Sequence, residues 1–142
     1  MKKIFIILIL IIAISAKDTY AQNGVPNTLA YLQTIVDNKS NYIGQPFSVL
    51  LDRLQIQIKY FSRFPGLHHD KTKETSTSFS FYLPQDDFND FYLTYPKLEI
   101  YWQPYLNATQ SGVLFRNSRG EWNTDAYNFY KNAIIKDIQI RD

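Results

Sequence analysis

The sequence predicts an α+β fold: a two-layer sandwich in which an N-terminal helix pair and one C-terminal helix pack on one face of a mostly antiparallel sheet of about 4–5 strands. Three segments carry apolar residues at helical spacing, and several others alternate between apolar and polar residues. Gln, Lys and Ser fill the polar positions of these strands, which gives each strand one apolar and one polar face. Helices should therefore cover only the apolar face of the sheet.

The first residues have the pattern of a secretory signal peptide. Two lysines precede an uncharged, Ile- and Leu-rich run at residues 4–16, and the small residues Thr19 and Ala21 fit the positions before a signal-peptidase cleavage site. The run is shorter than the about 20 residues that a membrane-spanning helix needs. We therefore expect removal of residues 1–21, a single small α+β domain at residues 22–142, and no stable membrane anchor. An uncleaved N-terminal anchor is the alternative.

Charge and cysteine content exclude several functional classes. Three of the fifteen basic residues and one of the thirteen acidic residues lie within residues 1–21, so the rest of the chain carries twelve of each. A chain without a basic excess has no long-range field to attract nucleic acid, and we expect no nucleic-acid partner. The chain has no cysteine, which excludes disulfides and favours a bacterial periplasmic or secreted protein.

Three helices are expected, and two of them have clear N-terminal caps. They span residues 28–37, 46–53 and 125–133. Asn27 or Thr28 can cap the first helix and Asn123 or Thr124 the last, because a short polar side chain can accept a hydrogen bond from the free N–H groups of the first turn.

Gly44 stands between the first two predicted helices and raises the question of a phosphate-binding loop. Such a loop would need further glycines and a Lys-Ser/Thr pair at the start of the next helix, and the sequence has neither. Pro46 follows instead, and proline suits the first turn of a helix. We interpret Gly44 as a turn.

Alternation of apolar and polar residues predicts the strands. They are residues 54–62, 75–83, 98–103 and 135–140, and the short apolar run at 113–116 is expected as a further strand, the fourth in chain order. The first two should form an antiparallel hairpin, Pro104 should end the third, and residues 117–120 should form a type I turn after the fourth. The last strand resembles the first in length and alternation, which suggests that the two are neighbours. Residues 84–96 fit neither pattern, and both a helical turn and a binding loop are open there.

Catalytic groups are few in this sequence. The only histidines, His68 and His69, are adjacent and followed by Asp70. Neighbouring side chains of an extended segment point to opposite faces, so these residues form a weak candidate metal site, and we expect no cofactor. A serine nucleophile would depend on the same histidines, and no Gly-x-Ser-x-Gly turn occurs. We expect no enzymatic activity, with a metal-dependent hydrolase as the least favoured alternative.

Aromatic residues suggest binding instead. Twenty-one Phe, Tyr and Trp residues remain after residues 1–21, and Tyr and Trp suit both protein interfaces and sugar stacking. The expected contact residues are Gln55, Gln57, Tyr82, Tyr101, Trp102 and Tyr105. The leading hypothesis is a non-catalytic exported interaction module (an inhibitor, immunity-like or envelope-associated protein) that binds another protein through the open sheet face. The alternative is a small carbohydrate-binding module that stacks a glycan on Trp102 or Trp122.

Overall fold

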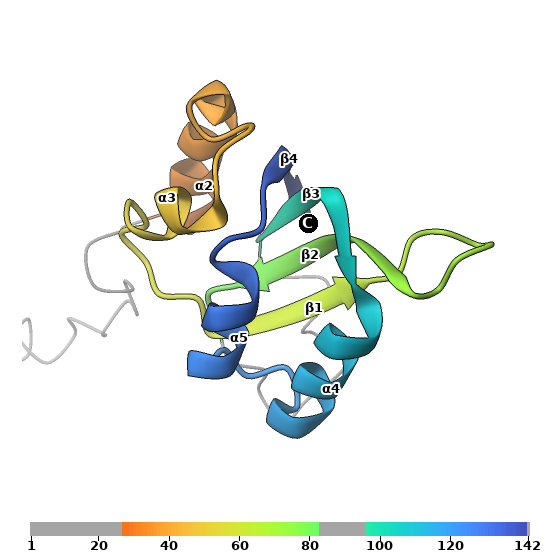
Figure 1. Ribbon diagram of the computed structural model, residues 1–142. Helices are drawn as coiled ribbons and strands as arrows, with labels where there is room; N and C mark the ends of the chain where they lie inside the picture. Colours follow the sequence, from red (N-terminus) through yellow and green to blue (C-terminus); the bar gives the residue numbers. More distant parts are fainter. Residues whose placement is uncertain (1–26, 83–95, 142) are drawn as a thin grey trace, which may run out of the picture.

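The computed structural model describes residues 27–82 and 96–141, which form an α+β fold with helices packed on a four-stranded antiparallel sheet (Figure 1). The elements are α2 (Thr28–Asp37), the 3₁₀ helix η1 (Lys39–Asn41), α3 (Phe47–Leu51), β1 (Tyr60–Phe64), β2 (Lys73–Ser80), β3 (Lys97–Asn107), α4 (Ala108–Ser118), α5 (Thr124–Tyr130) and β4 (Ile135–Arg141). The predicted signal peptide and nearly all of residues 84–96 lie outside the described residues. Within the two described ranges, no helix is long and apolar enough to cross a membrane.

The strands follow one another in the order β1-β2-β3-β4, and each is antiparallel to its neighbours. Phe61, Phe79, Leu98 and Ile140 form one row across all four strands. In Figure 1, α5 lies in front of the sheet, α2 and α3 stand to its left with α2 next to β4, and α4 lies below β1. The predicted layer of helices on one face of an antiparallel sheet is thus confirmed.

The predicted helices are present, and polar side chains cap two of them. Asn27 Oδ1 accepts a hydrogen bond from the Ala30 N–H at 3.0 Å, and Asn123 Oδ1 accepts one from the Ala126 N–H at 3.0 Å. The second and third helices are shorter than predicted. Gly44 is a turn residue with φ +80°, and its N–H donates to the Ile135 carbonyl at 2.8 Å.

Helix α3 is attached to the segment that leads into β4. The Phe47 N–H donates to the Ala133 carbonyl at 2.8 Å, and the Ser48 N–H donates to the Lys131 carbonyl at 2.9 Å. These bonds satisfy N–H groups of the first helical turn, which have no partner inside the helix. The start of α3 and residues 131–133 are therefore held together although they are far apart in the sequence.

The predicted strand at residues 54–62 is only partly correct. Regular pairing begins at Tyr60, although the expected alternation in burial holds before it: Ile56 and Ile58 are buried and Gln55 and Gln57 are exposed. Alternating burial needs only an extended chain against a core, whereas a strand also needs a partner along its backbone. The alternation in the sequence indicates that the chain is extended against a core, but it does not show whether a second strand pairs with it.

The predicted strand at residues 113–116 is wrong, because these residues lie inside α4. Asn107 caps this helix by accepting from the N–H groups of Thr109 and Gln110 at 3.0 and 3.1 Å. The predicted turn at residues 117–120 is the C-terminal end of the same helix, where the left-handed Arg119 (φ 54°) ends it.

Two predictions about the other strands are also wrong. Strand β3 does not end at Pro104 but continues to Asn107, and no residue of β2 or β4 lies opposite Pro104, so its missing N–H breaks no ladder bond. Strand β4 pairs with β3 and not with residues 54–62. There Ile138 stands opposite Ile100, and the two extend the apolar face of the sheet.

Aromatic rings fill the core. Phe79 is fully buried, and its ring centroid lies 4.8 Å from that of Phe47, 5.5 Å from Trp122, 5.7 Å from Tyr130 and 6.4 Å from Trp102. Most of these pairs meet edge to face, the arrangement that the charge distribution of aromatic rings favours. The aromatic-rich composition thus builds the interior.

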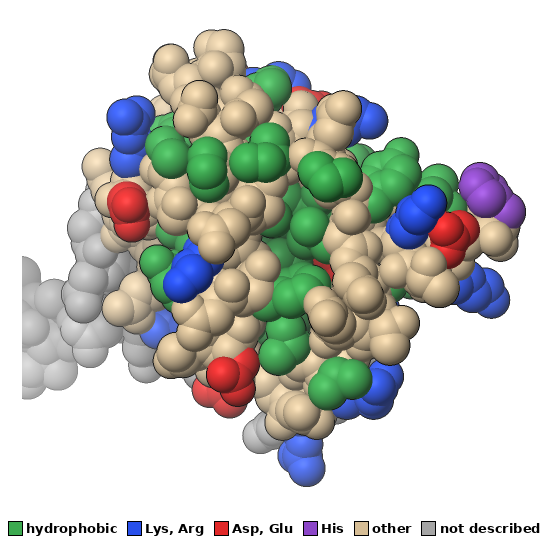
Figure 2. Space-filling view, viewed as in Figure 1, with side chains coloured by type: hydrophobic (Ala, Val, Ile, Leu, Met, Phe, Trp, Pro, Cys, Tyr) green, Lys and Arg blue, Asp and Glu red, His purple; other side chains and the backbone are tan. Residues whose placement is uncertain are grey.

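The loop between β1 and β2 projects from the body of the molecule and carries both histidines (Figure 2). His68 and His69 are exposed. Asp70 accepts hydrogen bonds from the N–H and hydroxyl of Thr72 at 3.0 and 2.5 Å and pairs with Lys73 at 3.2 Å. Its side chain is thus used to shape the loop. Among the described residues, no group of three or more His, Cys, Asp or Glu side chains could hold a metal ion.

Candidate functional site

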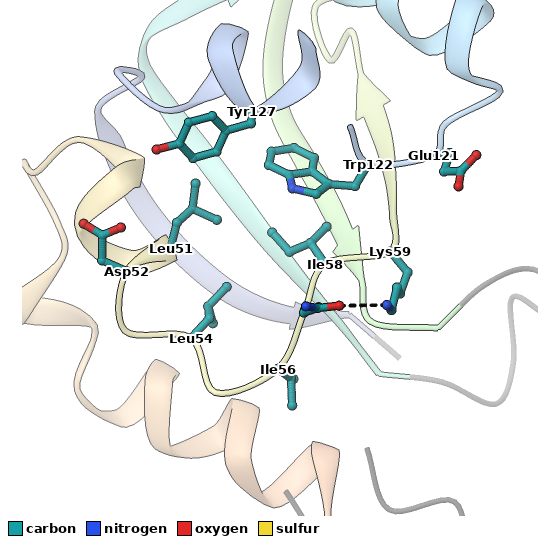
Figure 3. Close-up of a pocket in the computed structure, with 10 residues that line it drawn as sticks. Leu51, Asp52, Leu54, Ile56, Ile58, Lys59, Glu121, Trp122 and Tyr127 are labelled. Atoms are coloured by element: carbon teal, nitrogen blue, oxygen red, sulfur yellow. Dashed lines mark hydrogen bonds between the residues drawn. The ribbon is translucent and has the colours of Figure 1, made fainter. Parts of the chain in front are cut away.

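A groove of about 560 Å³ opens between residues 54–59 and the start of α5 (Figure 3). This volume lies within the range of small-ligand sites. Aliphatic and aromatic side chains form its floor: Leu51, Leu54, Ile56, Ile58, Trp122 and Tyr127. Polar side chains complete the lining: Asp52, Gln57, Lys59 and Glu121.

The groove exists because two paired segments separate. The Phe61 N–H donates to the Gly120 carbonyl at 2.8 Å, and the Trp122 N–H donates to the Lys59 carbonyl at 3.0 Å. Beyond this short bridge, residues 54–58 run toward α3 while Asn123 begins α5. The groove occupies the fork between them.

Gly120 makes the bridge possible. Its φ of +82° belongs to the region that glycine adopts most easily, and a Cβ built there would lie 2.3 Å from the Tyr60 ring. A side chain at this position would force the Tyr60 ring or the backbone of residue 120 to shift. Gly120 therefore allows the close approach of the two segments that precedes Trp122.

Trp122 packs on the aromatic core with one side of its ring and lines the groove. Its ring is half-buried, meets Phe79 edge to face at 5.5 Å and stacks on Tyr130 at 6.2 Å. In Figure 3 its side chain, Ile58, Leu51 and Tyr127 surround one space. The floor of the groove is thus an extension of the aromatic core that a ligand can reach.

The rim of the groove is charged. Asp52 and Glu121 are exposed and lie on opposite sides in Figure 3, and the Lys59 ammonium donates to Gln57 Oε1 at 2.9 Å. The lining holds two carboxylates and one ammonium group. It contains no His, Ser, Thr or Cys, and so the described part of the groove has no nucleophile paired with a base.

The predicted contact residues do not form one surface. Gln57 lines the groove, and Gln55 lies beside it with its N–H bonded to the Tyr31 hydroxyl at 2.9 Å. Tyr105 is 43% exposed near the far end of β3, and the Tyr82 hydroxyl shares a hydrogen bond of 2.6 Å with Thr28. Only the two glutamines are neighbours of the groove.

The prediction that Trp102 is a surface contact is wrong. Its side chain is fully buried, and its Nε1–H donates to Thr77 Oγ1 at 2.9 Å. Tyr101 and Trp102 do face opposite sides of β3, and Trp102 is the one that points into the core. The tryptophan that lines a groove is Trp122.

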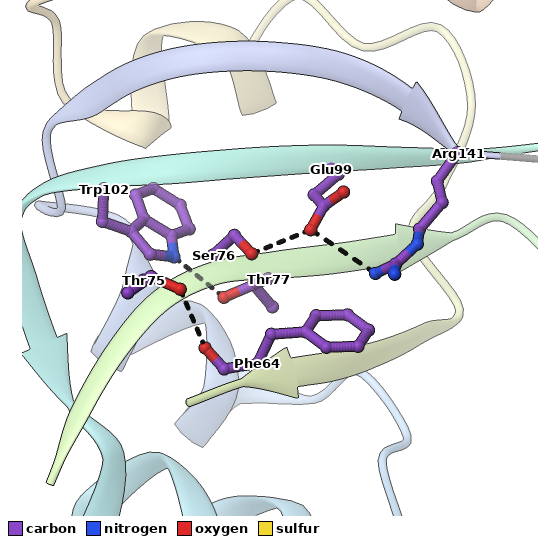
Figure 4. A network of polar contacts seen from close by, with 7 residues as sticks. All are labelled: Phe64, Thr75, Ser76, Thr77, Glu99, Trp102 and Arg141. Atoms are coloured by element: carbon purple, nitrogen blue, oxygen red, sulfur yellow. Dashed lines mark hydrogen bonds and ion pairs between the residues drawn. The ribbon is translucent and has the colours of Figure 1, made fainter. Parts of the chain in front are cut away.

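The expected open sheet face is largely closed (Figure 4). Ser76, Ser78 and Ser80 of β2 are each no more than 3% exposed. Arg141 of β4 lies 4.4 Å over the Phe64 ring of β1, so side chains of the two outer strands meet above the inner strands. Small polar residues at alternate positions of a strand predict a solvent-exposed face. They also leave room for longer side chains, here those of Arg141 and Phe64, to cover them.

Glu99 of β3 links the two neighbouring strands on this covered face, because its side chain interacts with Ser76 of β2 and Arg141 of β4. Its Oε1 accepts from Ser76 Oγ at 2.8 Å and lies 3.5 Å from the Arg141 guanidinium (Figure 4). Tyr101, beside it, is half-buried, and burial raises the pKa of its hydroxyl, with Glu99 adding to the shift. On this face the serines of β2 are therefore covered and the Glu99 carboxylate already has partners.

A buried carboxyl, Glu74, escaped the sequence analysis because it follows the charged loop residues. It is fully buried, and its Oε1 accepts from the hydroxyls of Tyr130, at 2.9 Å, and Thr77. Burial raises the pKa of Glu74, although these hydrogen bonds oppose the shift. Burial and the nearby Glu74 also raise the pKa of Tyr130.

Glu74→Gln should become more stable relative to the wild type as the pH rises from 4 to 8. A raised pKa in the folded state means that the stability linked to Glu74 is complete below the pKa of an unfolded glutamate and is lost as the pH rises through the folded pKa. The relative gain should be about 1.4 kcal/mol for each unit of the shift. Urea unfolding at several pH values measures it, with exposed Glu121→Gln as the control. A pH-independent difference for Glu74→Gln would contradict the prediction.

No protein-family model, curated protein or solved structure matches this chain. Its function therefore has to be inferred from the groove and from the chemistry of the residues that line it.

Proposed function

We propose that the chain is a non-catalytic, exported interaction module that binds another protein, and that the groove beside Trp122 is its binding site. The observation that carries this proposal is a groove of about 560 Å³ with an apolar floor, a charged rim and no paired nucleophile and base in its described lining. Export rests on the sequence pattern of residues 1–21 alone.

The groove suits a protein better than the sheet face does. Most of the floor is aliphatic, and Leu51, Leu54 and Ile58 give a bound hydroxyl group no hydrogen-bond partner. They can bury an apolar side chain, which is the usual anchor of a protein interface. The proposed contact surface thus moves from the face of the sheet to the groove.

A glycan remains the second candidate ligand. Trp122 supplies an aromatic ring, and Asp52, Glu121 and Gln57 supply carboxylate and amide groups near it. A ring flanked by such groups can stack a sugar and bind its hydroxyls. Titration of tryptophan fluorescence with a glycan panel tests this candidate: a saturable change that is lost in Trp122→Ala would favour a glycan over a protein.

Site-specific photo-crosslinking in the producing cell tests the leading proposal. A photoreactive residue at Tyr127, which is 37% exposed and lines the groove, should cross-link to a discrete protein. The matched control is Tyr105, which is 43% exposed but lies outside the groove. Equal cross-linking at both positions, or none at Tyr127, would reject the groove as a protein-binding site.

A further inference from the structure

We propose that the groove binds its partner by strand addition: an extended segment of the partner pairs with residues 56–58, places an apolar side chain against Trp122 and sets a basic side chain beside Asp52 or Glu121. This inference rests on the proposed function, because it specifies which part of a partner protein enters the groove.

Within residues 27–82 and 96–141, nothing pairs with the backbone of residues 56–58. The N–H and C=O groups of Ile56, Gln57 and Ile58 have no hydrogen-bond partner among the described residues, although all three residues line the groove. Their side chains already alternate in burial, with Ile56 and Ile58 inside and Gln57 outside. An extended segment with free backbone groups is a template for another strand.

The residues that directly follow this segment, Lys59 and Tyr60, already pair with residues 121–122. The Lys59 carbonyl accepts from the Trp122 N–H, and Tyr60 and Glu121 form an antiparallel bridge. The pairing stops where the chain turns into α5 at Asn123. A guest strand in the groove would continue, along residues 56–58, a pairing that the chain's own residues begin.

The floor of the groove suits the side chains of such a guest. Every second residue of an extended segment points to the same face, so the guest presents alternate side chains to the groove. Leu54, Ile58 and Trp122 would cover an apolar side chain placed between them. This requirement predicts apolar residues at alternate positions of the partner segment.

Charge on the rim sets the remaining preference. Asp52 and Glu121 form no ion pair within the described residues, whereas the Lys59 ammonium is bound to Gln57. The rim therefore has an excess of negative charge. A lysine or arginine of the partner complements it, and complementary charge raises both specificity and the association rate.

An array of random heptapeptides, probed with the full chain, tests the preference. The selected peptides should combine alternating apolar residues with at least one Lys or Arg. The double variant Asp52→Asn, Glu121→Gln should bind the strongest of them about tenfold more weakly. The control Asp125→Asn removes an exposed carboxylate of α5 outside the groove and should bind as the wild type does. An array without binders, or binders without basic residues, would overturn the proposal.

Amide hydrogen exchange tests strand addition directly. Exchange at Ile56, Gln57 and Ile58 should slow about tenfold or more when the strongest selected heptapeptide binds. A peptide that binds without this protection would overturn strand addition while leaving the groove as a protein-binding site; the absence of cross-links from position 127 rejects the proposed function itself. Protection already present in the free chain would mean that this chain, or a second copy, occupies the segment, which also overturns the proposal.

Discussion

Phe79→Ala is expected to lower the free energy of unfolding by about 3–5 kcal/mol. Phe79 is fully buried and contacts the rings of Phe47, Trp102, Trp122 and Tyr130, so the truncation removes buried apolar area and leaves a cavity between four rigid side chains. Rigid rings collapse poorly into such a space, which places the expected cost toward the upper end of the range. Urea unfolding followed by tryptophan fluorescence measures this change.

Tyr105→Ala is the matched control for the loss of a ring. Tyr105 is 43% exposed, and its truncation should change the free energy of unfolding by no more than about 0.5 kcal/mol. Both variants lose an aromatic ring, so the difference between their free energies of unfolding measures the contribution of burial. A cost for Phe79→Ala as small as that of Tyr105→Ala would mean that the ring cluster is not the centre of the core.

Gly120→Ala is expected to cost about 2–5 kcal/mol, the sum of the backbone penalty for a left-handed residue and the strain of an added methyl group. The methyl group would lie 2.3 Å from the ring of Tyr60, which also meets the Phe115 ring edge to face at 6.1 Å, so either this ring or the backbone at the Tyr60–Glu121 bridge has to shift. Because this bridge positions Trp122, the variant should also lose ligand binding in the groove. Thermal and urea unfolding measure the stability effect.

Gly44→Ala isolates the contribution of the close contact. Gly44 has nearly the same φ, +80° against +82°, but no atom lies within 4 Å of the position that a Cβ would take. This variant should therefore show only the backbone penalty, about 1–2 kcal/mol. Equal costs at the two positions would contradict the proposed clash with Tyr60.

Local signals in the sequence predicted α2, α3 and α5 but not α4. Apolar spacing and the capping residues Asn27 and Asn123 act within a few residues, and both caps form as expected. The prediction for residues 113–116 was wrong because a short run of apolar residues fits a strand and one turn of a helix equally well. The Asn107 cap was the signal that could have resolved this ambiguity.

The hairpin of β1 and β2 was predicted correctly, but the other neighbours in the sheet and the groove were not predictable in the same way. Both depend on contacts between residues far apart in sequence, such as Ile138 with Ile100 and Lys59 with Trp122. The alternation around Gln57 correctly marked an exposed residue, but nothing in the sequence shows that its backbone has no partner among the residues that the structure describes. Glu74 shows the same limit, because its burial comes from elements that follow it in the chain.

The attachment of α3 to the residues before β4 has a consequence for folding kinetics. Phe47 and Ala133 are more than eighty residues apart, so their bond closes a long loop, and topologies with such distant contacts fold slowly. A nascent or truncated chain that stops before Ala133 lacks the carbonyl that accepts from the Phe47 N–H, so the first turn of α3 is without this anchor even where the Phe47 ring already packs on Phe79. Until this contact forms, folding of the chain is incomplete, and proteases and chaperones can still act on it.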